Sequence, residues 1–374
     1  MHLEMRKKRM KIMFVHLLNN YTGSPRVLSN ILSYLITNTN HCLTLLTSDS
    51  SGCLSDIEGV NYVDNKYRWK NSIISRIFSI LISQIYQFFF VLFGKKNDVY
   101  YINTILPFGA ALAAYIRKCR IIYHIHEVYI HPSVFQKVCL YVLKITASKI
   151  IVVSEYVKNF YQAKMDKELV VICNTVSKEI FDEGFELRGN EEYMKSKFCN
   201  KLILMPSGLK KYKGIDVFVE LAKRMPAYNF KLVLSCERGE AMKYFKETEL
   251  PPNLEFNYQV ISMIELYKEA SIVVNLTLPD LCIETFGMVL LEGACFSTPS
   301  IAPNIGGPVE IVTGSNGFLI NPYEIEDIEE KIHLLLDNMN VYMEYSTQAF
   351  ITTEKFIPDV LLKRIRMIIE NKGR

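Results

Sequence analysis

Short apolar runs alternate along this chain with longer segments whose apolar residues recur at helical spacing. The first pattern is typical of buried β-strands and the second of helices that pack through one face. In the first half, the strand-like runs are residues 11–17, 42–47, 99–103, 120–124, 149–153 and 169–172. Helical spacing occurs at residues 26–36, 109–116, 134–147 and 155–162. This alternation predicts an α/β fold with a mostly parallel sheet covered by helices.

The same alternation begins again after a charged, irregular segment at residues 177–200. The later strand-like runs are residues 201–205, 230–234, 271–276 and 299–301, and the later helices are 214–225, 262–269, 286–296 and 358–371. A chain of 374 residues also exceeds the length of one ordinary core. We therefore predict two consecutive α/β domains, 1–180 and 181–355, with a ligand cleft between them.

Residues 72–93 form a long apolar segment in which Arg76 is the one charged residue. Its length and composition are compatible with a transmembrane helix. The polar residues, however, recur at helical spacing, at Ser72, Arg76, Ser79, Ser83 and Gln87, with Ser75 and Gln84 beside them. Such a stripe indicates an amphipathic helix. Two interpretations remain open: the helix packs on the sheet of the first domain, or it lies in a membrane interface beside Lys70, Lys95 and Lys96.

Composition and charge exclude several classes of protein. The chain is 49% hydrophobic and 22% charged, as expected of a globular protein and not of a disordered one. Residues 1–150 hold 18 Lys and Arg against 7 Asp and Glu, whereas the remainder holds 25 against 32. The basic first half favours an anionic surface or ligand. Nucleic acid is not expected as a partner, because zinc-finger and RNP-like motifs are absent.

The nine cysteines are scattered, without a C-x-x-C pair or a histidine at metal-ligand spacing. The sequence shows no secretory signal ahead of them. A reducing cytoplasm is therefore the expected location, and neither a disulfide framework nor a metal site is expected.

Two features of the segment from Glu284 to Pro308 are not explained by packing. Glu292 lies within residues 286–296, which are otherwise apolar or glycine. A carboxylate in a core helix is costly unless it faces a polar cavity or a partner. The second feature is the pair Gly306 and Gly307 before Pro308, which indicates an abrupt turn of the backbone.

A helix that begins at Thr285 or Phe286 would place Glu284 at its N-terminus and Glu292 about two turns further along it. The free amide donors of this N-terminus would form an anion site, and they belong to Phe286, Gly287, Met288 and Val289. A carboxylate on each side of an anion site suits a ligand with hydroxyls on both sides of a diphosphate. A nucleotide sugar is such a ligand.

Two segments of the first half carry further candidate residues. His124, His126 and Glu127 follow a predicted strand, where functional side chains gather in open α/β sheets. Each histidine either bonds a substrate hydroxyl or has a structural role, and a metal pair is not expected because no further ligand is apparent. Gly23 lies in a loop between a strand and a helix, which is either a ligand cradle or a plain turn.

In the second half, Lys210, Lys211 and Lys213 lie between Gly208 and Gly214 and open a predicted helix. Cations beside a flexible loop at a helix N-terminus are placed to hold phosphates. A solvated lysine cluster is the alternative. The spacing of a Walker loop is absent.

The segment Glu284-x7-Glu292 resembles the E-x7-E signature of family 4 glycosyltransferases, which are retaining enzymes of the GT-B fold. The specific part is E-x-F-G-x-x-x-x-E followed by G-G-x-x-E, which ends at Glu310. Other matches in the family's order are Gly23, His126, Glu127, Val153, Ser154, Glu155, Asn174, Lys213, Gly214, Gly306 and Gly307. The resemblance covers nearly the whole chain. It implies two Rossmann-like domains facing a central cleft, with the acceptor bound mainly by the first and the donor by the second. It also implies that a last helix, 356–374, completes the first domain.

The resemblance also implies roles for single residues. Glu292 would hold the ribose hydroxyls, Glu284 would contact the donor sugar, and Lys213 would neutralise the leaving diphosphate. The implied catalytic residues are His126, Glu284 and Lys213. The implied donor-binding residues are Gly23, Lys210, Lys213, Glu284, Thr285, Phe286, Gly287, Met288, Val289 and Glu292. One position departs from the family, since Gly208 stands where an arginine is usual, and a nearby lysine lacks the bidentate fork of that arginine.

The resemblance implies a retaining hexosyltransferase that moves a sugar from a nucleotide-diphosphate sugar to an acceptor hydroxyl, and no metal or other cofactor is expected. The basic first domain and residues 72–93 favour a lipid-linked or oligosaccharide acceptor in bacterial surface polysaccharide assembly, such as lipopolysaccharide O-antigen or capsule. The expected location is the cytoplasm, with peripheral contact to the inner face of an anionic membrane. Two alternatives remain: a catalytically silent partner subunit, and an epimerase or phosphorylase of the same fold. The sugar, the base and the acceptor linkage are not determined by the sequence.

Overall fold

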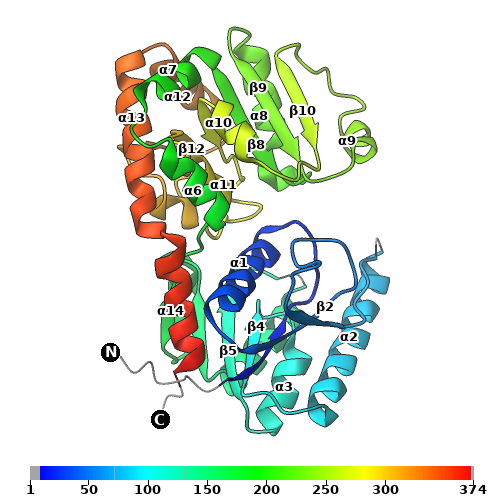
Figure 1. The fold of residues 1–374 in the computed structure, drawn as a ribbon. Helices are drawn as coiled ribbons and strands as arrows, with labels where there is room; N and C mark the ends of the chain where they lie inside the picture. The colour runs from blue at the N-terminus through cyan, green and yellow to red at the C-terminus, as the bar shows by residue number, and fades with distance from the viewer. Residues whose placement is uncertain (1–8, 71, 131, 372–374) are drawn as a thin grey trace, which may run out of the picture. The chain divides into compact units, whose positions relative to one another are not determined.

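The computed structural model describes residues 9–70, 72–130 and 132–371. It divides into two compact units, one formed by Met1–Cys173 with Asp359–Arg374 and the other by Asn174–Pro358. Each unit contains one parallel sheet, so the predicted α/β fold is confirmed (Figure 1). The border follows Cys173 and not residue 180. The reason is that residues 178–200 form helices that belong to the second unit.

The first unit is built on a seven-stranded sheet with the order β3-β2-β1-β4-β5-β6-β7. Its strands are β1 (Lys11–Val15), β2 (Cys42–Thr47), β3 (Val60–Asp64), β4 (Val99–Asn103), β5 (Arg120–Ile125), β6 (Lys149–Val152) and β7 (Leu169–Val171). The sequence pattern misses β3, an edge strand with a mostly half-exposed or exposed surface. The central strands β1 and β4 pair in parallel, and their carboxyl ends lie next to each other.

Helices cover both faces of this sheet, as right-handed connections require. They are α1 (Gly23–Asn38), α2 (Ile73–Phe93), α3 (Phe108–Ile116), α4 (Ser133–Thr146), α5 (Glu155–Gln162) and α14 (Pro358–Glu370). The C-terminal helix α14 is fixed by Arg120, whose guanidinium donates to the carbonyl oxygens of Ile368 and, at 2.6 Å, Ile369. A cation on the last carbonyls of a helix also offsets the helix dipole. Most of α14 therefore belongs to the first unit.

The predicted helix at residues 72–93 is α2, and its polar stripe faces the protein. Ser79, Ser83, Gln84 and Gln87 are buried, whereas many of the apolar side chains are exposed. Among the residues that the structure describes, α2 is the one helix with the length and composition needed to cross a membrane.

The second unit has a six-stranded parallel sheet with the order β10-β9-β8-β11-β12-β13. Its strands are β8 (Leu202–Ser207), β9 (Asn229–Leu234), β10 (Leu254–Tyr258), β11 (Ile272–Val274), β12 (Ser300–Ala302) and β13 (Gly317–Leu319). Its helices are α6 (Lys178–Glu186), α7 (Glu191–Asn200), α8 (Ile215–Arg224), α9 (Arg238–Tyr244), α10 (Ile264–Glu269), α11 (Met288–Cys295), α12 (Ile325–Leu336) and α13 (Met339–Thr352).

The prediction of an irregular linker at residues 177–200 is wrong, because two capped helices occupy it. Ser177 caps α6 through the amide of Ile180, and Asn190 caps α7 through the amide of Tyr193. Helix α6 packs on α11, and α7 packs on α13. The charged residues that suggested a linker lie mostly on the solvent side of these helices.

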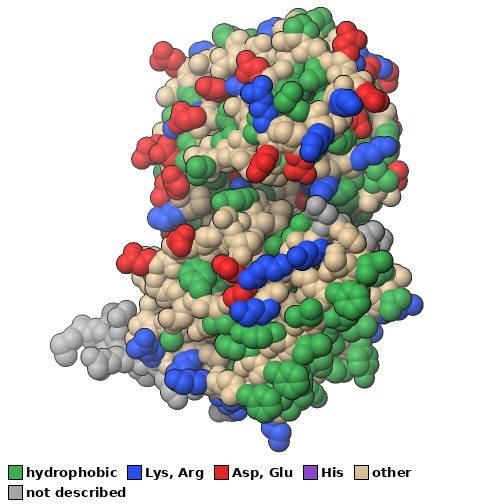
Figure 2. Space-filling view, turned by 90° about the vertical axis from the view of Figure 1, so that its right-hand side faces the viewer, with side chains coloured by type: hydrophobic (Ala, Val, Ile, Leu, Met, Phe, Trp, Pro, Cys, Tyr) green, Lys and Arg blue, Asp and Glu red, His purple; other side chains and the backbone are tan. Residues whose placement is uncertain are grey.

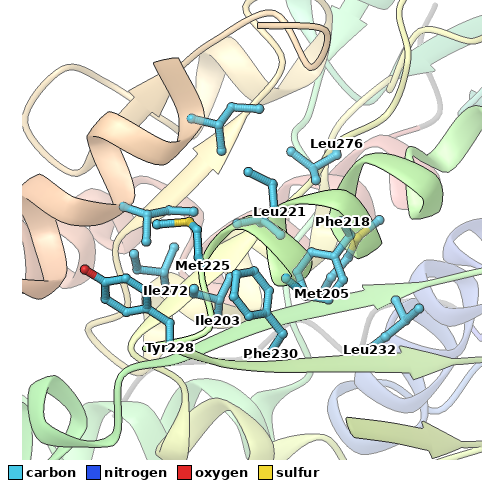
Figure 3. Close-up of a cluster of buried hydrophobic side chains, with 14 of the residues drawn as sticks. Ile203, Met205, Phe218, Leu221, Met225, Tyr228, Phe230, Leu232, Ile272 and Leu276 are labelled. Atoms are coloured by element: carbon cyan, nitrogen blue, oxygen red, sulfur yellow. The ribbon is translucent and has the colours of Figure 1, made fainter. Parts of the chain in front are cut away.

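The core of the second unit lies between α8 and the strands β8 and β9 (Figure 3). Phe218 of α8 packs edge-on against Phe230 of β9, with ring centroids 5.3 Å apart. Leu221, one turn further along α8, is likewise fully buried. This packing fixes the first turn of α8 and therefore the loop that precedes it.

Candidate active site

Lys213 and Glu284 form a partly buried ion pair in the second unit. The Nζ atom of Lys213 lies 2.7 Å from Oε2 of Glu284, and the two side chains are 28% and 18% exposed. Burial alone would raise the pKa of Glu284 and lower that of Lys213. The charge of each partner and their hydrogen bond outweigh burial, so the pKa of Glu284 is lowered and that of Lys213 is raised. Both groups are therefore charged near neutral pH.

The backbone between β8 and α8 places Lys213 at this position. Lys213 ends a short 3-10 helix, and Gly214 follows it with a φ of +74°. A Cβ atom at Gly214 would lie 2.0 Å from the carbonyl oxygen of Leu276. The glycine thus provides the left-handed conformation and lets this loop touch the segment after β11.

Asn275 connects the end of β11 to the ion pair. Its Oδ1 accepts hydrogen bonds from the amide and the hydroxyl of Thr277, at 3.0 and 2.7 Å. Its Nδ2 therefore faces the other way and donates to Oε2 of Glu284 at 3.3 Å. Asn275 orients the carboxylate that holds Lys213.

The glycine pair predicted beside the site lies against the backbone of residues 284–286. A Cβ atom at Gly306 would be 2.3 Å from the carbonyl oxygen of Glu284, and one at Gly307 would be 2.3 Å from that of Thr285. The amide of Gly307 also donates to the carbonyl oxygen of Glu284 at 2.9 Å. At both positions any larger residue would clash with this backbone, so glycine is required.

The predicted start of the following helix at Thr285 or Phe286 is wrong, because α11 begins at Met288. Gly287 precedes it with a φ of +99°, a left-handed conformation that separates residues 284–286 from the helix. The amide of Phe286 donates to the carboxylate of Glu284 and is not a free donor of the helix. Of the four predicted amides, those of Met288 and Val289 lie in the first turn of α11.

Glu292 is 1% exposed, whereas the implied contact with ribose hydroxyls needs an accessible carboxylate. The hydroxyl of Tyr267, on α10, donates to its Oε2 at 2.6 Å. Tyr267 is itself fully buried, and its ring stacks on Phe296. The buried carboxylate is therefore hydrogen-bonded within the second unit.

The remaining lysines of this loop lie in solvent. Lys210 and Lys211 are exposed, in contrast to Lys213. At Gly208, the position of the usual arginine, the nearest heavy atom to an added Cβ would be Ser235 Oγ at 3.7 Å. The backbone at this position thus leaves room for a side chain.

The first unit carries a cluster of buried histidines at the carboxyl ends of β1, β4 and β5. Asn103 Oδ1 lies 3.0 Å from His126 Nε2, and Asn103 Nδ2 lies 3.0 Å from His16 Nδ1. The Nδ2 atom of Asn103 also donates to the carbonyl oxygen of Ser24 at 3.2 Å, so Oδ1 is the acceptor and His126 carries its proton on Nε2. This assignment leaves Nδ1 of His126 as an acceptor.

His124 and His126 lie side by side, with ring centroids 4.3 Å apart. His124 Nδ1 is 2.8 Å from the hydroxyl of Tyr101. Burial lowers the pKa of His16 to about 4 and that of His124 to about 3. Burial and the two neighbouring histidines also lower the pKa of His126. All three are neutral at pH 7, so they act as hydrogen-bonding groups and not as cations.

Glu127 holds the backbone around His126. Its Oε1 accepts from the amide of Ile105 at 2.8 Å, and its Oε2 accepts from the amide of His126 at 3.2 Å. Burial raises the pKa of Glu127 to about 7 in spite of these bonds. Gly23, the other candidate of the first unit, begins α1 and has no heavy atom within 4 Å of an added Cβ.

Four polar residues of these clusters are not identified from the sequence, namely His16, Asn103, Tyr267 and Asn275. Three of them could have been found by the rule that selected His124 and His126. His16 follows β1, Asn103 ends β4 and Asn275 follows β11, all at carboxyl ends of strands. Tyr267 has no such signal, because it lies on a helix.

Comparison with protein families identifies the chain. The family model described as glycosyl transferases group 1 matches residues 191–351, and the model described as Glycosyltransferase Family 4 matches residues 21–179. Together the two models cover most of the chain. It belongs to the group 1 and family 4 glycosyltransferases.

Relatives of this glycosyltransferase are distant in sequence. An uncharacterised glycosyltransferase of Methanocaldococcus jannaschii is 29% identical over 230 residues, 60% of this chain and 60% of the relative. N-acetyl-alpha-D-glucosaminyl L-malate synthase of Bacillus anthracis is 25% identical over 193 residues, 50% of this chain and 49% of the relative. These matches thus span about half to 60% of the relatives' length.

Solved structures share the fold over nearly the whole glycosyltransferase chain. HepE of Anabaena, in complex with UDP and glucose, has a TM-score of 0.77 at 19% identity and covers 97% of this chain and 100% of its own. WaaG, described as a glycosyltransferase involved in lipopolysaccharide biosynthesis, has a TM-score of 0.74 at 15% identity, with coverages of 97% and 100%. The fold is therefore that of the GT-B glycosyltransferases.

Proposed function

We propose that this glycosyltransferase moves a hexosyl residue from a nucleotide-diphosphate sugar to an acceptor hydroxyl with retention of the anomeric configuration. The observation that carries the proposal is the partly buried ion pair of Lys213 with Glu284, the first glutamate of the E-x7-E segment. A fixed, charged ammonium is suited to the negative charge that develops on a leaving diphosphate. Glu284 keeps this ammonium charged in spite of its burial.

The donor is a nucleotide sugar, and uridine diphosphate sugars are the first candidates. HepE, which shares the fold, forms complexes with UDP-glucose and with UDP and glucose. In this chain the diphosphate would be met by Lys213 and the amides of Met288 and Val289. Lys210 would approach it from solvent. The ribose would bind Glu292, which requires the carboxylate to exchange part of its buried contacts for ribose hydroxyls.

The reaction uses no protein nucleophile and no metal in this proposal. The sequence has no D-x-D pair of the kind that holds a metal-bound diphosphate. Cleavage of the sugar–phosphate bond develops oxocarbenium character on the sugar and charge on the diphosphate. The acceptor attacks from the same face, and its proton passes to a phosphate oxygen. Lys213 stabilises the leaving group, and neutral His126 offers Nδ1 to a sugar hydroxyl.

The acceptor in this proposal is a lipid-linked glycan in bacterial surface polysaccharide assembly, at the inner face of the cell membrane. Two features support it: the excess of basic residues in residues 1–150 and the exposed apolar side chains of α2. The shared fold with WaaG is consistent with it.

A catalytically silent subunit is the second candidate, and Gly208 in place of the usual arginine favours it. A donor screen that follows nucleotide release from several uridine and guanosine sugars tests both candidates. Release that depends on an acceptor supports a transferase, and conversion of the donor without an acceptor indicates an epimerase. A chain that binds nucleotide without any turnover is a silent subunit.

A further inference from the structure

Helix α2 is attached to the first unit through its polar side. The hydroxyl of Ser83 donates to the carbonyl oxygen of Asn65 at 2.8 Å, and that of Ser79 donates to the carbonyl oxygen of Arg68 at 2.7 Å. On the same side, Gln84 Oε1 accepts from the amide of Gly109, the second residue of α3, at 2.8 Å. Hydrogen bonds therefore fix the orientation of α2 on the unit.

The opposite side of α2 is apolar and faces solvent. Its exposed side chains are Ile74, Ile77, Phe78, Leu81, Ile82, Ile85, Phe89 and Phe93, each between 42% and 79% exposed. A helix on the surface of a water-soluble domain has the reverse orientation, with its apolar side inward. Since the polar residues are bonded within the unit, α2 cannot turn this apolar side inward without losing those bonds. The exposed apolar side of α2 is therefore a candidate binding surface.

A second apolar stripe lies on α4 and extends this surface. Val134, Val138, Tyr141 and Ile145 recur at helical spacing and are 39% to 69% exposed. Helix α3 contacts both α2 and α4 and adds exposed Tyr115 and Ile116. We call the exposed apolar residues of these three helices the α2–α4 face. Figure 2 shows hydrophobic side chains gathered on the side of the first unit that carries α2.

The segment that carries the α2–α4 face is strongly basic. Residues 70–149 contain ten Lys and Arg but only two Asp and Glu, namely Asp98 and Glu127. Glu127 accepts hydrogen bonds from backbone amides inside the unit. The exposed lysines of this segment include Lys70, Lys95, Lys96, Lys118, Lys137 and Lys144. An apolar surface on a basic segment matches the interface of a bilayer that contains anionic lipids.

We propose that the α2–α4 face docks on the surface of an anionic lipid bilayer, with α2 and α4 lying in its interface. The polar bonds of α2 argue against a spanning helix, because a spanning α2 would have to leave them. The charge argues against a second copy of this chain on the same face, since two basic segments would repel each other. The docking deepens the proposed membrane location of the acceptor, which rests on the same surface, but it needs no donor, so it can fail while sugar transfer to an acceptor hydroxyl stands.

Trp69 provides a built-in reporter for this docking. It is the single tryptophan of the chain, it is 53% exposed, and it lies four residues before α2. Its ring is covered by the guanidinium of Arg76, on the first turn of α2, at 4.0 Å. With vesicles of phosphatidylglycerol and phosphatidylcholine, we expect a blue shift of its emission and protection from iodide. Vesicles of phosphatidylcholine alone are expected to produce neither effect.

Two variants separate the apolar and the basic contributions. Replacing Phe78, Ile82 and Ile85 together by serine removes three exposed side chains and is expected to weaken vesicle partitioning by about 100-fold. The double variant Lys95→Glu and Lys96→Glu is expected to weaken it at least about tenfold, with a smaller loss at high salt. Matched controls in the second unit are Ile261→Ser, at a fully exposed apolar position, and Lys246→Glu, and both are expected to bind vesicles like the wild type.

Several outcomes would overturn the proposal. One is the absence of any shift of Trp69 emission with anionic vesicles. Another is a serine variant that stays folded by circular dichroism and still binds vesicles like the wild type. A third is sedimentation that shows a dimer which the serine variant dissociates, because the face would then be a contact between copies. Equal binding to neutral and anionic vesicles would also contradict it.

Discussion

Oε2 of Glu284 accepts hydrogen bonds from two residues, Lys213 and Asn275, which come from different loops of the second unit. The lysine supplies the charge, and the asparagine fixes the direction of the carboxylate. Such a fixed carboxylate holds Lys213 before any substrate binds. Preorganised charge of this kind is more effective than charge that must be assembled during the reaction.

Asn275→Ala is expected to lower kcat about tenfold, because the carboxylate loses a charge-assisted hydrogen bond that orients it. The donor KM is expected to change little. Asn275→Asp should be worse, since a second carboxylate beside Glu284 raises the pKa of that group and moves the acidic limb of the pH–rate profile upward. Steady-state kinetics from pH 5 to 8 measure both effects. An unshifted pH profile in Asn275→Asp would show that Asn275 does not position the pair.

Gly208→Arg is expected to fold normally, because the space around an added Cβ is open. A guanidinium at this position offers two parallel hydrogen bonds to phosphate oxygens, so kcat/KM for the donor should rise roughly tenfold or more. Gly208→Lys is the charge-matched control and should give a smaller gain. Equal or lower kcat/KM in both variants would indicate that this position is remote from the diphosphate.

The buried histidines predict that the first unit is acid-labile. The pKa of His16 is lowered to about 4 and that of His124 to about 3, so the folded unit prefers the neutral rings. The contribution of these neutral rings to the free energy of unfolding is complete above the ordinary histidine pKa of about 6.5. It is lost progressively as the pH falls below that value. At pH 5 each histidine should cost about 2 kcal/mol of the free energy of unfolding.

Glu127 acts in the opposite direction, because its pKa is raised to about 7 and the folded unit prefers the protonated carboxyl. Its effect therefore lowers stability as the pH rises from about 4.5 to 7, by at most about 3 kcal/mol. The loss of stability from three histidines at pH 5 exceeds the gain from the protonated carboxyl of Glu127. Urea unfolding, followed by Trp69 emission, should therefore give a lower free energy of unfolding at pH 5 than at pH 8. His124→Gln should reduce this difference by about 2 kcal/mol. An unchanged difference would contradict the assignment.

Variants of Glu292 and Tyr267 distinguish a structural role of the Glu292 carboxylate from a role in donor binding. Tyr267→Phe removes a hydrogen bond to a buried carboxylate and should lower the free energy of unfolding by about 1–3 kcal/mol, with little effect on the donor KM. Glu292→Gln retains an acceptor for Tyr267 but removes the charge, so it should raise the donor KM at least about tenfold at nearly wild-type stability. An unchanged KM together with lost stability would show that Glu292 serves the fold alone.

Sequence patterns locate the central strands because these strands are buried on both faces. The predicted runs 42–47 and 99–103 coincide with β2 and β4. The edge strands β3, β10 and β13 are missed. Strands β3 and β10 carry polar, partly exposed residues that leave no continuous apolar run, and β13 has three residues, the first of which is a glycine. The linker error has a similar cause, because α6 and α7 are short, charged helices with little buried surface.

Sequence motifs predict those site residues that belong to the motif itself. They do not predict contacts between side chains of neighbouring strands. The motif selected Glu284 and Lys213, which the structure brings together. Asn103 escaped notice because its partner His126 comes from the adjacent strand, and this neighbourhood depends on strand order and register. The apolar pattern misplaces the start of α11 because it carries no sign of the left-handed conformation of Gly287.

The central claim is that Lys213 promotes departure of the nucleotide diphosphate. The most direct measurement is single-turnover nucleotide release from the donor identified in the screen, in wild type and Lys213→Ala, with Lys211→Ala as the matched control from the same loop. We expect a loss of at least about 1,000-fold in Lys213→Ala and activity within about threefold of wild type in Lys211→Ala. Nucleotide release at the wild-type rate by a folded Lys213→Ala protein would contradict it.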